Sequence, residues 1–457
     1  MPAGRERVRG AAVSGKAEAG RGGKAVARGG VKRGYATAKK TAPAKGAIAG
    51  KVKLRILAPT RYPWRFNGPR RSRHAIDRRR FVPFNYLHPR VEGVTVFEPS
   101  LLPGPRRRHD LVHAFNRIPL GRTPFVIGFE SHLPRAFGWE RSLWFRGLSA
   151  MLRSDRCRAV VAISHFARTT FLRQHEGAPA ATRAALRRKL TVRLPSLPVA
   201  ERPAPLPEGE AIRLVFVGAH FARKGGLVAL RAMSLARARG LAVELDIVSD
   251  LTVGRASWTD PVDPAYYEPF WRDLAMPGVR HHGALDNAAV LDLVGRAHFL
   301  LLPTFGDTFG YSVIEAMARG VPTIVTDQGA LPEFVRDAGA GGDGGNGIVL
   351  PLPTRHGEWI HMNDADRGSA RFERIHRDAV EALAEAMVER LEALAGDRAR
   401  LVAMRATALE DARTLFDPED TSHYWDALYE RAMRGPVTVA PPMTTPLPLA
   451  EPAKEPL

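Results

Sequence analysis

Short apolar runs alternate with helical segments through residues 212–327, and this alternation restricts the possible folds more than any other feature of the sequence. The runs are "IRLVFVGA" (212–219), "AVELDIVSD" (242–250), "VRHHGAL" (279–285), "HFLLLPT" (298–304) and "VPTIVTD" (321–327). An amphipathic stretch, "GGLVALRAMSLARARG", follows the first of them. Strands that alternate with helices form parallel sheets. This half of the chain therefore predicts an α/β, Rossmann-like domain.

The first half of the chain shows the same pattern less regularly. Apolar runs at 53–60 ("KLRILAPT"), 123–130 ("TPFVIGFE") and 158–164 ("RAVVAIS") predict buried strands. The stretch after Ser164 predicts a helix with that serine as its N-cap, because a serine hydroxyl accepts readily from an N–H of the first turn. Residues 190–211 are Pro-rich and too irregular for a core element, so they predict an interdomain linker.

Helical patterns return after the second set of strands. Residues 378–416 predict charged helices, and 418–433 predict a last helix with an apolar stripe of Tyr424, Trp425, Leu428 and Tyr429. We expect this stripe to pack on a domain. The expected organisation is a basic tail (1–50), a first domain (51–200), a second domain (201–417), a returning helix (418–435) and a Pro-rich tail (436–457).

Positive charge is concentrated at the N-terminus. The formal net charge is +21, and residues 1–50 contain twelve Lys/Arg against two Glu. This Ala/Gly-rich segment has too few large apolar residues to form a core, so we expect both tails to be disordered. The basic tail could bind anionic lipid or nucleic acid; a solubilising tail, or a start codon placed too far upstream, is the simpler alternative.

Several classes of protein are disfavoured by the sequence. A single cysteine, Cys157, excludes an intrachain disulfide and a Cys-rich zinc site. No run approaches the roughly 20 apolar residues of a membrane helix. The N-terminus lacks the apolar core of a secretory signal, which predicts a cytoplasmic protein, with peripheral contact at the inner face of the membrane left open.

Two loops that follow strands are candidate ligand sites, because open α/β sheets bind ligands beyond the carboxyl ends of their strands. The first is "FVGAHFARKGG" (216–226), where Arg223 and Lys224 precede a helix that could attract phosphate. The loop matches neither the G-x-G-x-x-G nor the P-loop pattern. Taken alone, an Arg-Lys pair is more often a solvated helix start than an anion site.

The second loop is "PTFGDTFGYSVIEAM" (303–317). Gly310 permits close approach of the backbone, and N–H groups from Phe309 to Ser312 would face a ligand. Asp307 could merely cap the helix, and Glu315 could merely be favourable charge near the helix start. Together, however, the two carboxylates suit the vicinal hydroxyls of a sugar or ribose.

The stretch "PTFGDTFGYSVIEAMARGVPTIVTDQGALPEFV" (303–335) resembles the signature of glycosyltransferase family 4, whose members are retaining enzymes of GT-B fold. The family pattern is E-x7-E; here it reads Asp307-x7-Glu315, followed by Ala316-Met317. The loop at 216–226 and the segment "GVRHHGAL" (278–285) are also similar to family motifs. The resemblance is good over residues 210–340 and weak over 50–200. It implies a GT-B fold, with two Rossmann-like domains facing a central cleft and a C-terminal helix that returns to the N-terminal domain.

The resemblance also implies roles for individual residues. It assigns the ribose hydroxyls to Glu315 and the donor sugar to Asp307. The diphosphate would be held by Lys224 with Arg223, helped by the backbone of Gly310 and Tyr311, and Phe309 is a further donor-binding residue. The base would meet the backbone of His282 and Gly283, and His132 would lie near the donor sugar. Glu130 lies beside His132 in the sequence. A structural histidine is the alternative for His132.

Two departures from the family pattern leave the activity open. Asp307 is one methylene shorter than the usual glutamate, and Ala219 occupies a position where many members have arginine, a role that Arg223 could take over. The implied reaction moves a sugar from a nucleotide-sugar donor to a hydroxyl acceptor, expected to be a cell-surface glycan or glycolipid precursor. An inactive homologue that binds an anionic polymer or a lipid surface is the alternative.

We expect the implied reaction to need no metal or other cofactor. The single D-x-D, Asp364-Ala365-Asp366, predicts an exposed loop because no buried strand precedes it. The basic, aromatic-rich segment 60–90 could favour an anionic acceptor, or could be an irregular surface loop. Peripheral membrane contact is a possible partner interaction, and nucleic acid is not expected.

Overall fold

The computed structural model describes residues 53–60, 62–79, 82–83, 94–96, 109–339 and 344–438. The predicted tail at 1–50 and residues 439–457 of the predicted tail at 436–457 lie outside the described residues, as do residues 61, 80, 81 and 84–90 of the basic segment 60–90. Within the described ranges, two six-stranded sheets carry the fold. None of the helices in these ranges is both long and apolar enough to cross a membrane.

The first sheet has the strand order β2-β1-β5-β7-β8-β9, with all neighbours parallel. Its strands are β1 (Arg55–Pro59), β2 (Ala75–Arg79), β5 (Leu111–Phe115), β7 (Phe125–Phe129), β8 (Cys157–Ala162) and β9 (Leu190–Val192). Every residue of β5 and β7 is buried, as expected for parallel strands covered on both faces. β3 (Val82–Pro83), β4 (Val94–Val96) and β6 (Ile118–Pro119) form a small separate sheet.

Four helices belong to the first domain: α1 (Tyr62–Asn67), α2 (Leu143–Arg153), α3 (His165–Gln174) and α4 (Ala180–Lys189). The predicted cap of α3 is confirmed, because the Ser164 hydroxyl accepts from the Ala167 N–H at 2.9 Å. Lys189, the last residue of α4, binds the C-terminal end of the neighbouring helix α2. Its ammonium donates to the carbonyls of Arg153 (2.8 Å) and Ser154 (2.7 Å), where α2 ends.

The second sheet has the strand order β12-β11-β10-β13-β14-β15, again entirely parallel. Its strands are β10 (Ile212–Val217), β11 (Val243–Val248), β12 (Val279–His281), β13 (Phe299–Leu302), β14 (Thr323–Thr326) and β15 (Gly347–Leu350). In chain order this is the Rossmann arrangement 3-2-1-4-5-6. The order reverses between β10 and β13, so this switch point is where such sheets bind ligands.

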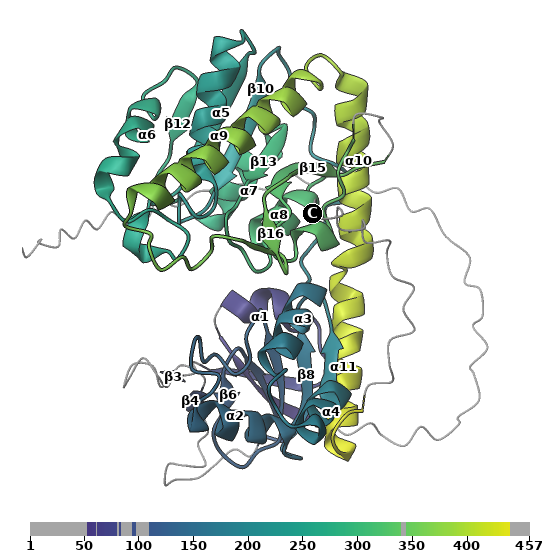
Figure 1. The fold of residues 1–457 in the computed structure, drawn as a ribbon. Coiled ribbons are helices and arrows are strands. Elements are labelled where there is room, and N and C mark those ends of the chain that lie inside the picture. Colours follow the sequence, from purple (N-terminus) through teal and green to yellow (C-terminus); the bar gives the residue numbers. More distant parts are fainter. Residues whose placement is uncertain are drawn as a thin grey trace, which may run out of the picture. The chain divides into compact units, whose positions relative to one another are not determined.

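The second domain also contains the helices α5 (Gly226–Ala238), α6 (Glu268–Asp273), α7 (Asn287–Gly295), α8 (Tyr311–Met317) and α9 (Ala370–Glu392), and a short hairpin of β16 (Thr354–Arg355) and β17 (Glu358–Trp359). α5 and α9 lie side by side and share one buried apolar cluster with the sheet (Figure 1).

The segment expected to be a linker is structured at its start. Residues 190–192 form β9, the edge strand of the first sheet, so the prediction that 190–211 holds no core element is wrong there. Residues 193–211 contain no helix or strand. They are nevertheless anchored, because the buried Arg405 guanidinium donates to the carbonyls of Ala204 and Ala297, each at 2.9 Å.

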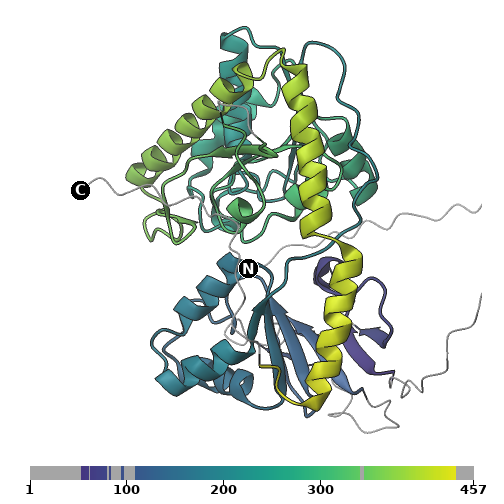
Figure 2. The same cartoon turned by 90° about the vertical axis from the view of Figure 1, so that its right-hand side faces the viewer.

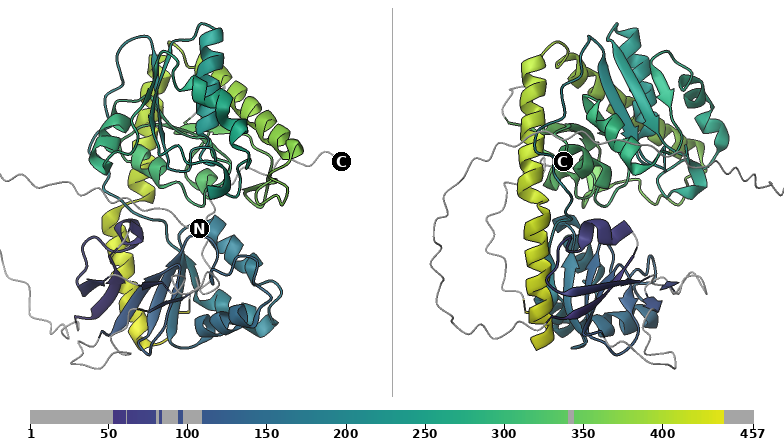
Figure 3. Two further views of the ribbon diagram at one scale, coloured as in Figure 1. Left: turned by 90° about the vertical axis from the view of Figure 1, so that its left-hand side faces the viewer. Right: turned by 180° about the vertical axis from the view of Figure 1, so that it is seen from behind.

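Two consecutive helices, α10 (Arg398–Leu415) and α11 (Pro418–Arg434), end the described chain. α10 contacts α8 of the second domain, whereas α11 contacts β7 of the first and lies across the face of its sheet (Figures 2 and 3).

The apolar stripe of α11 is part of the first domain's core. Trp425, Leu428 and Tyr429 are buried in a cluster formed with residues of the first sheet, and the Tyr429 hydroxyl lies 2.8 Å from His113 Nδ1. The last helix therefore returns to the N-terminal domain. Two Rossmann-like domains with a returning helix confirm the predicted GT-B fold class.

Candidate functional site

The loops that follow β10 and β13 meet at the switch point of the second sheet. Gly225 has a φ of +89°, and a Cβ there would collide with the Pro303 carbonyl. Only glycine allows this approach. The Phe305 N–H donates to the carbonyl of Arg223 at 2.8 Å. The close contact between the two loops brings the basic residues of one against the acidic residue of the other.

Lys224 and Asp307 form a largely buried ion pair between these loops. Burial works to raise the pKa of the Asp307 carboxyl, but the Lys224 ammonium and the nearby Arg223 outweigh it and hold the pKa below its ordinary value. Burial also lowers the pKa of Lys224, and Asp307 opposes that change. The two residues predicted to hold diphosphate and donor sugar therefore contact each other directly.

Arg223 binds a backbone carbonyl, unlike its neighbour Lys224, which binds a carboxylate. Its guanidinium donates to the Gly306 carbonyl at 2.6 Å and lies under the Trp258 ring, with the carbon of the guanidinium 4.9 Å from the ring centre. The side chain is buried. Arg223 thus shapes the loop after β13 and adds positive charge beside Asp307.

The start of α8 is held by two further glycines. Gly310 has a φ of +83° and caps the helix without a side-chain hydrogen bond. Gly329, in the loop after β14, has a φ of +58° and leaves no room for a Cβ against the Asp307 carbonyl. The Phe309 N–H points at Asp307 Oδ1 at 3.4 Å. Three strand-end loops therefore converge on Asp307.

Glu315 lies in the second turn of α8, about 6 Å along the helix axis from Tyr311. Burial raises the pKa of Glu315, opposed by a hydrogen bond from Asn287 and by the positive charge of Arg65. Asn287 Nδ2 donates to Glu315 Oε1 at 3.3 Å, and Arg65 donates to Asn287 Oδ1 at 2.6 Å. Arg65 belongs to α1, so this chain of hydrogen bonds joins the two Rossmann-like domains.

A second contact from α1 reaches the start of α8. Asn67 Nδ2 donates to the Tyr311 hydroxyl at 3.0 Å, and the Phe66 and Tyr311 rings lie 4.7 Å apart. Sequence reasoning missed Arg65, Asn67 and Asn287. No local pattern distinguishes them, because their partners are more than twenty positions away in the sequence.

The predicted base-binding residues lie at the end of β12, two strands away from β10. The His282 N–H donates to Ile247 at 2.9 Å, and the Gly283 carbonyl accepts from Ser249 at 3.1 Å, so both groups take part in strand pairing. The His282 imidazole lies 2.7 Å from a carboxylate oxygen of Asp246. This segment is therefore separated from the Lys224–Asp307 pair by the width of the intervening strands.

In the first domain, the loop after β7 carries both candidate residues, and they differ in their surroundings. Burial raises the pKa of Glu130, and the charges of Asp307 and Lys224 are close enough to affect it as well. The contacts of His132 are with Ser131, at 3.4 Å, and with the Phe137 ring. Burial also lowers the pKa of His132. Glu130 is thus the residue in electrostatic reach of the ion pair.

A further contact between the domains was not predicted. The Glu333 carboxylate, after β14, accepts from the N–H groups of His165 (2.8 Å) and Phe166 (2.6 Å) at the start of α3. Burial raises the pKa of Glu333 to about 7, although both hydrogen bonds act to lower it. The two N–H groups at the helix N-terminus favour the ionised carboxylate, but burial disfavours it more strongly.

The D-x-D segment lies in turns, and the Asp364 carboxylate accepts from the Asp366 N–H at 2.9 Å. Among the residues that the structure describes, no three His, Cys, Asp or Glu side chains gather in a way that could hold a metal ion.

The arrangement of the second domain agrees with a family match. Residues 211–355 match the family model described as Glycosyl transferases group 1. The match covers the sheet that carries both switch-point loops, and it includes Lys224, Asp307 and Glu315.

Three known proteins also resemble the chain, one over a short stretch and two over most of the chain at low sequence identity. D-inositol 3-phosphate glycosyltransferase from Streptomyces bingchenggensis is 36% identical over 74 residues, which are 16% of this chain and 15% of that protein. Anabaena HepE in complex with UDP is 14% identical, with a TM-score of 0.49 over 83% of this chain and 100% of that one. Sucrose-phosphate synthase from Thermosynechococcus elongatus is 16% identical, with a TM-score of 0.46 over 71% and 74% of the two chains.

Proposed function

We propose that the chain is a retaining glycosyltransferase of family 4, which transfers a sugar from a nucleotide-sugar donor to a hydroxyl acceptor. The observation that carries the proposal is the Lys224–Asp307 ion pair at the switch point of the domain that matches the group 1 family model. At this point the Lys224 ammonium can bind the diphosphate of a donor while the Asp307 carboxylate binds the sugar of the same donor.

In this proposal Lys224 stabilises the charge that builds on the departing nucleoside diphosphate. Preorganised charges of this kind are the largest contribution in many enzymes. Asp307 accepts hydrogen bonds from donor-sugar hydroxyls, and Glu315 from the ribose. The diphosphate then takes the proton of the acceptor hydroxyl on the same face of the sugar, so the configuration is retained and no metal is required.

The contacts of Arg223 bear on whether it can take over the role of the arginine that Ala219 replaces. Because its guanidinium is bonded to the Gly306 carbonyl and covered by Trp258, it cannot replace the arginine missing at Ala219 without rearrangement. We therefore assign the diphosphate mainly to Lys224, and expect Arg223 to act through the position of Asp307.

We further propose that the loop after β7 brings His132 towards the donor sugar from the first domain. Glu130 in the same loop is buried, and Asp307 and Lys224 are among the charges that influence it. The acceptor is proposed to be a glycan or glycolipid precursor, modified in the cytoplasm or at the inner face of the membrane. A degenerate transferase that binds an anionic polymer is the second candidate, favoured by Ala219 and by the shortened Asp307.

A thermal-shift screen of the full chain against nucleoside diphosphates and their sugars tests the proposal. We expect at least one nucleoside diphosphate to raise the melting temperature, and Lys224→Ala and Glu315→Ala to remove the shift. Lys53→Ala, an exposed lysine that precedes β1, is the matched control. Stabilisation by an anionic polymer but by no nucleotide would favour the second candidate.

Transfer itself needs a separate measurement. Released nucleoside diphosphate should appear when the stabilising sugar nucleotide is incubated with a candidate acceptor, and Asp307→Ala should abolish it. The anomeric configuration of the product, read by NMR, then decides between retention and inversion.

A further inference from the structure

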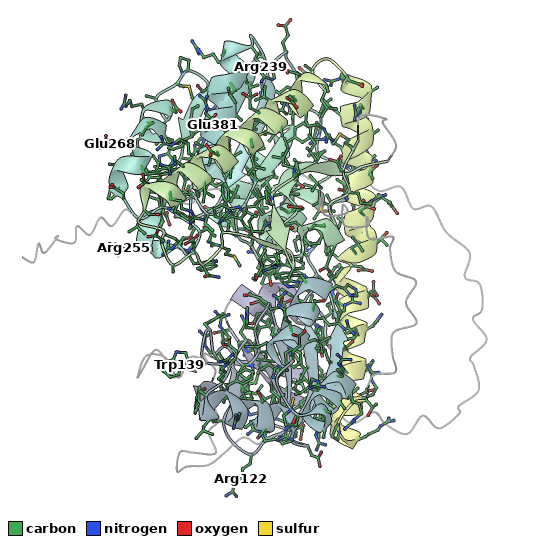
Figure 4. The ribbon with its side chains drawn as sticks, viewed as in Figure 1. Arg122, Trp139, Arg239, Arg255, Glu268 and Glu381 are labelled. Atoms are coloured by element: carbon green, nitrogen blue, oxygen red, sulfur yellow. The ribbon has the colours of Figure 1, made fainter. Side chains whose placement is uncertain are left out.

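An exposed apolar patch interrupts the surface of the first domain directly after the loop that carries Glu130 and His132. It consists of Phe137, Trp139, Leu143 and Trp144, with 50%, 47%, 80% and 38% of their surfaces exposed. Only eight large apolar side chains of the described residues are exposed to this degree, and these four fall within eight positions. Trp139 stands clear of the ribbon in Figure 4.

The fold explains why these side chains point outward. α2 buries Phe145, Leu148, Ser149 and Leu152 against the domain, and Leu143 and Trp144 begin the helix on its other faces. The Ser142 hydroxyl fixes the start of the helix by accepting from the Phe145 N–H at 3.1 Å. Gly138 has a φ of +84° and turns the chain between two exposed aromatic residues. The patch is thus held by a capped helix and a turn.

Arginine side chains surround the patch. Arg141 and Arg146 are exposed beside it, and the Arg135 guanidinium lies 4.9 Å from the centre of the Phe137 ring. Residues 135–189, which include α2 and the neighbouring α4, contain eleven Arg and one Lys against three Asp/Glu. Of these acids, Glu140 is partly buried near the Gln174 amide. The surroundings therefore attract anions.

We propose that the patch docks the protein on an anionic lipid bilayer, with Trp139, Leu143 and Trp144 in the interfacial region and Arg141 and Arg146 on lipid phosphates. Tryptophan favours the membrane interface, and arginine extends its charged group to the headgroups while its stem stays in apolar surroundings. An amphipathic helix with apolar and basic residues together is the usual form of such a contact.

The position of the patch connects membrane docking with the delivery of an acceptor. The ring of Phe137 lies 5.4 Å from that of His132, so the patch adjoins the loop after β7. A hydroxyl acceptor carried on a lipid would then be delivered at the acceptor-side domain. The docking itself does not rest on the proposed sugar transfer, because it can be measured without donor or acceptor.

The test is co-sedimentation of the full chain with vesicles of phosphatidylcholine, with or without about one third phosphatidylglycerol. We expect binding to the anionic vesicles, at least about tenfold weaker for Trp139→Ser/Leu143→Ser. Arg141→Ser and Arg146→Ser should each weaken it about fivefold. Val402→Ser, which removes a 51% exposed apolar side chain from α10, is the matched control and should bind like the parent.

Three results would overturn the proposal. The first is a parent chain that does not bind anionic vesicles. The second is undiminished binding of Trp139→Ser/Leu143→Ser, which would assign the binding to another segment, such as the basic residues 1–50 that all variants keep. The third is self-association in sedimentation velocity that the same double variant abolishes, which would assign the patch to a second copy of the chain. Unchanged circular dichroism and melting temperature establish that each variant is folded.

Discussion

Glu333→Gln tests how the two Rossmann-like domains contact each other. In the structure the Glu333 carboxyl accepts from the N–H groups of His165 and Phe166, and burial raises its pKa to about 7. Its ordinary pKa is 4.5. A carboxyl whose pKa is raised by burial favours the buried position when it is protonated. The stabilisation is therefore complete below about pH 4.5 and is lost as the pH rises through about 7.

The magnitude follows from the difference between these two pKa values. At about 1.4 kcal/mol per pH unit it corresponds to about 3 kcal/mol. The side chain is partly exposed, so screening by water reduces this to about 2 kcal/mol. In populations, that is about a thirtyfold change in the fraction of molecules in which Glu333 has left α3.

Hydrogen exchange at the start of α3 measures this fraction. The peptide that contains His165 and Phe166 should lose protection between pH 5.5 and 8.5 in the parent chain, after division by the intrinsic exchange rate at each pH. Glutamine does not ionise but keeps one acceptor oxygen, so Glu333→Gln should remove the pH dependence. Glu410→Gln, which changes an exposed carboxylate on α10, should keep it. Parallel pH profiles for the parent and Glu333→Gln would refute the reasoning.

Three other perturbations have defined outcomes. Gly225→Ala should cost at least about 2 kcal/mol in urea denaturation and abolish nucleotide stabilisation, whereas Gly240→Ala, with a φ of +73° but open space around it, should cost about 1 kcal/mol. Asp307→Asn should cost about 3 to 5 kcal/mol because it leaves the buried Lys224 unpaired, and adding Lys224→Met should restore most of the loss; a strictly additive double variant would contradict the pairing. Burial lowers the pKa of His113 from 6.5 to about 3, so its contribution to stability is present above pH 6.5 and lost as the pH falls towards 3; His113→Gln should show a smaller loss of stability between pH 7 and pH 4.

The sequence predicted the second domain far better than the first. In the second sheet β10, β13 and β14 are short runs of mostly apolar or β-branched residues, and pattern analysis detects such runs directly. In the first domain β5 reads "LVHAF", where the buried His113 breaks the apolar run, and its partner Tyr429 lies 316 positions away. β2 is an edge strand with charged residues, and β9 has three residues within a Pro-rich region. Neither has a pattern long enough to recognise.

The residues of the candidate site also differ in how far the sequence could predict them. Lys224 lies in the segment 216–226, and Asp307 and Glu315 lie in 303–317. Each segment lies at the end of a strand and contains glycines, so local patterns were enough to select these residues as candidates. Glu333 and Arg65 act through partners in the other domain. A preference for those partners depends on how the domains pack, and a single sequence carries no local trace of it.

The last helix also has a consequence for biosynthesis. Trp425 and Tyr429 complete a cluster whose other members begin at Leu54, so the N-terminal domain lacks part of its interior until α11 has left the ribosome. Domains usually fold in the order of their synthesis. Here the domain made first must wait for residues that are made after the second domain, and a fragment that stops before α11 would present an uncovered apolar face to chaperones and proteases.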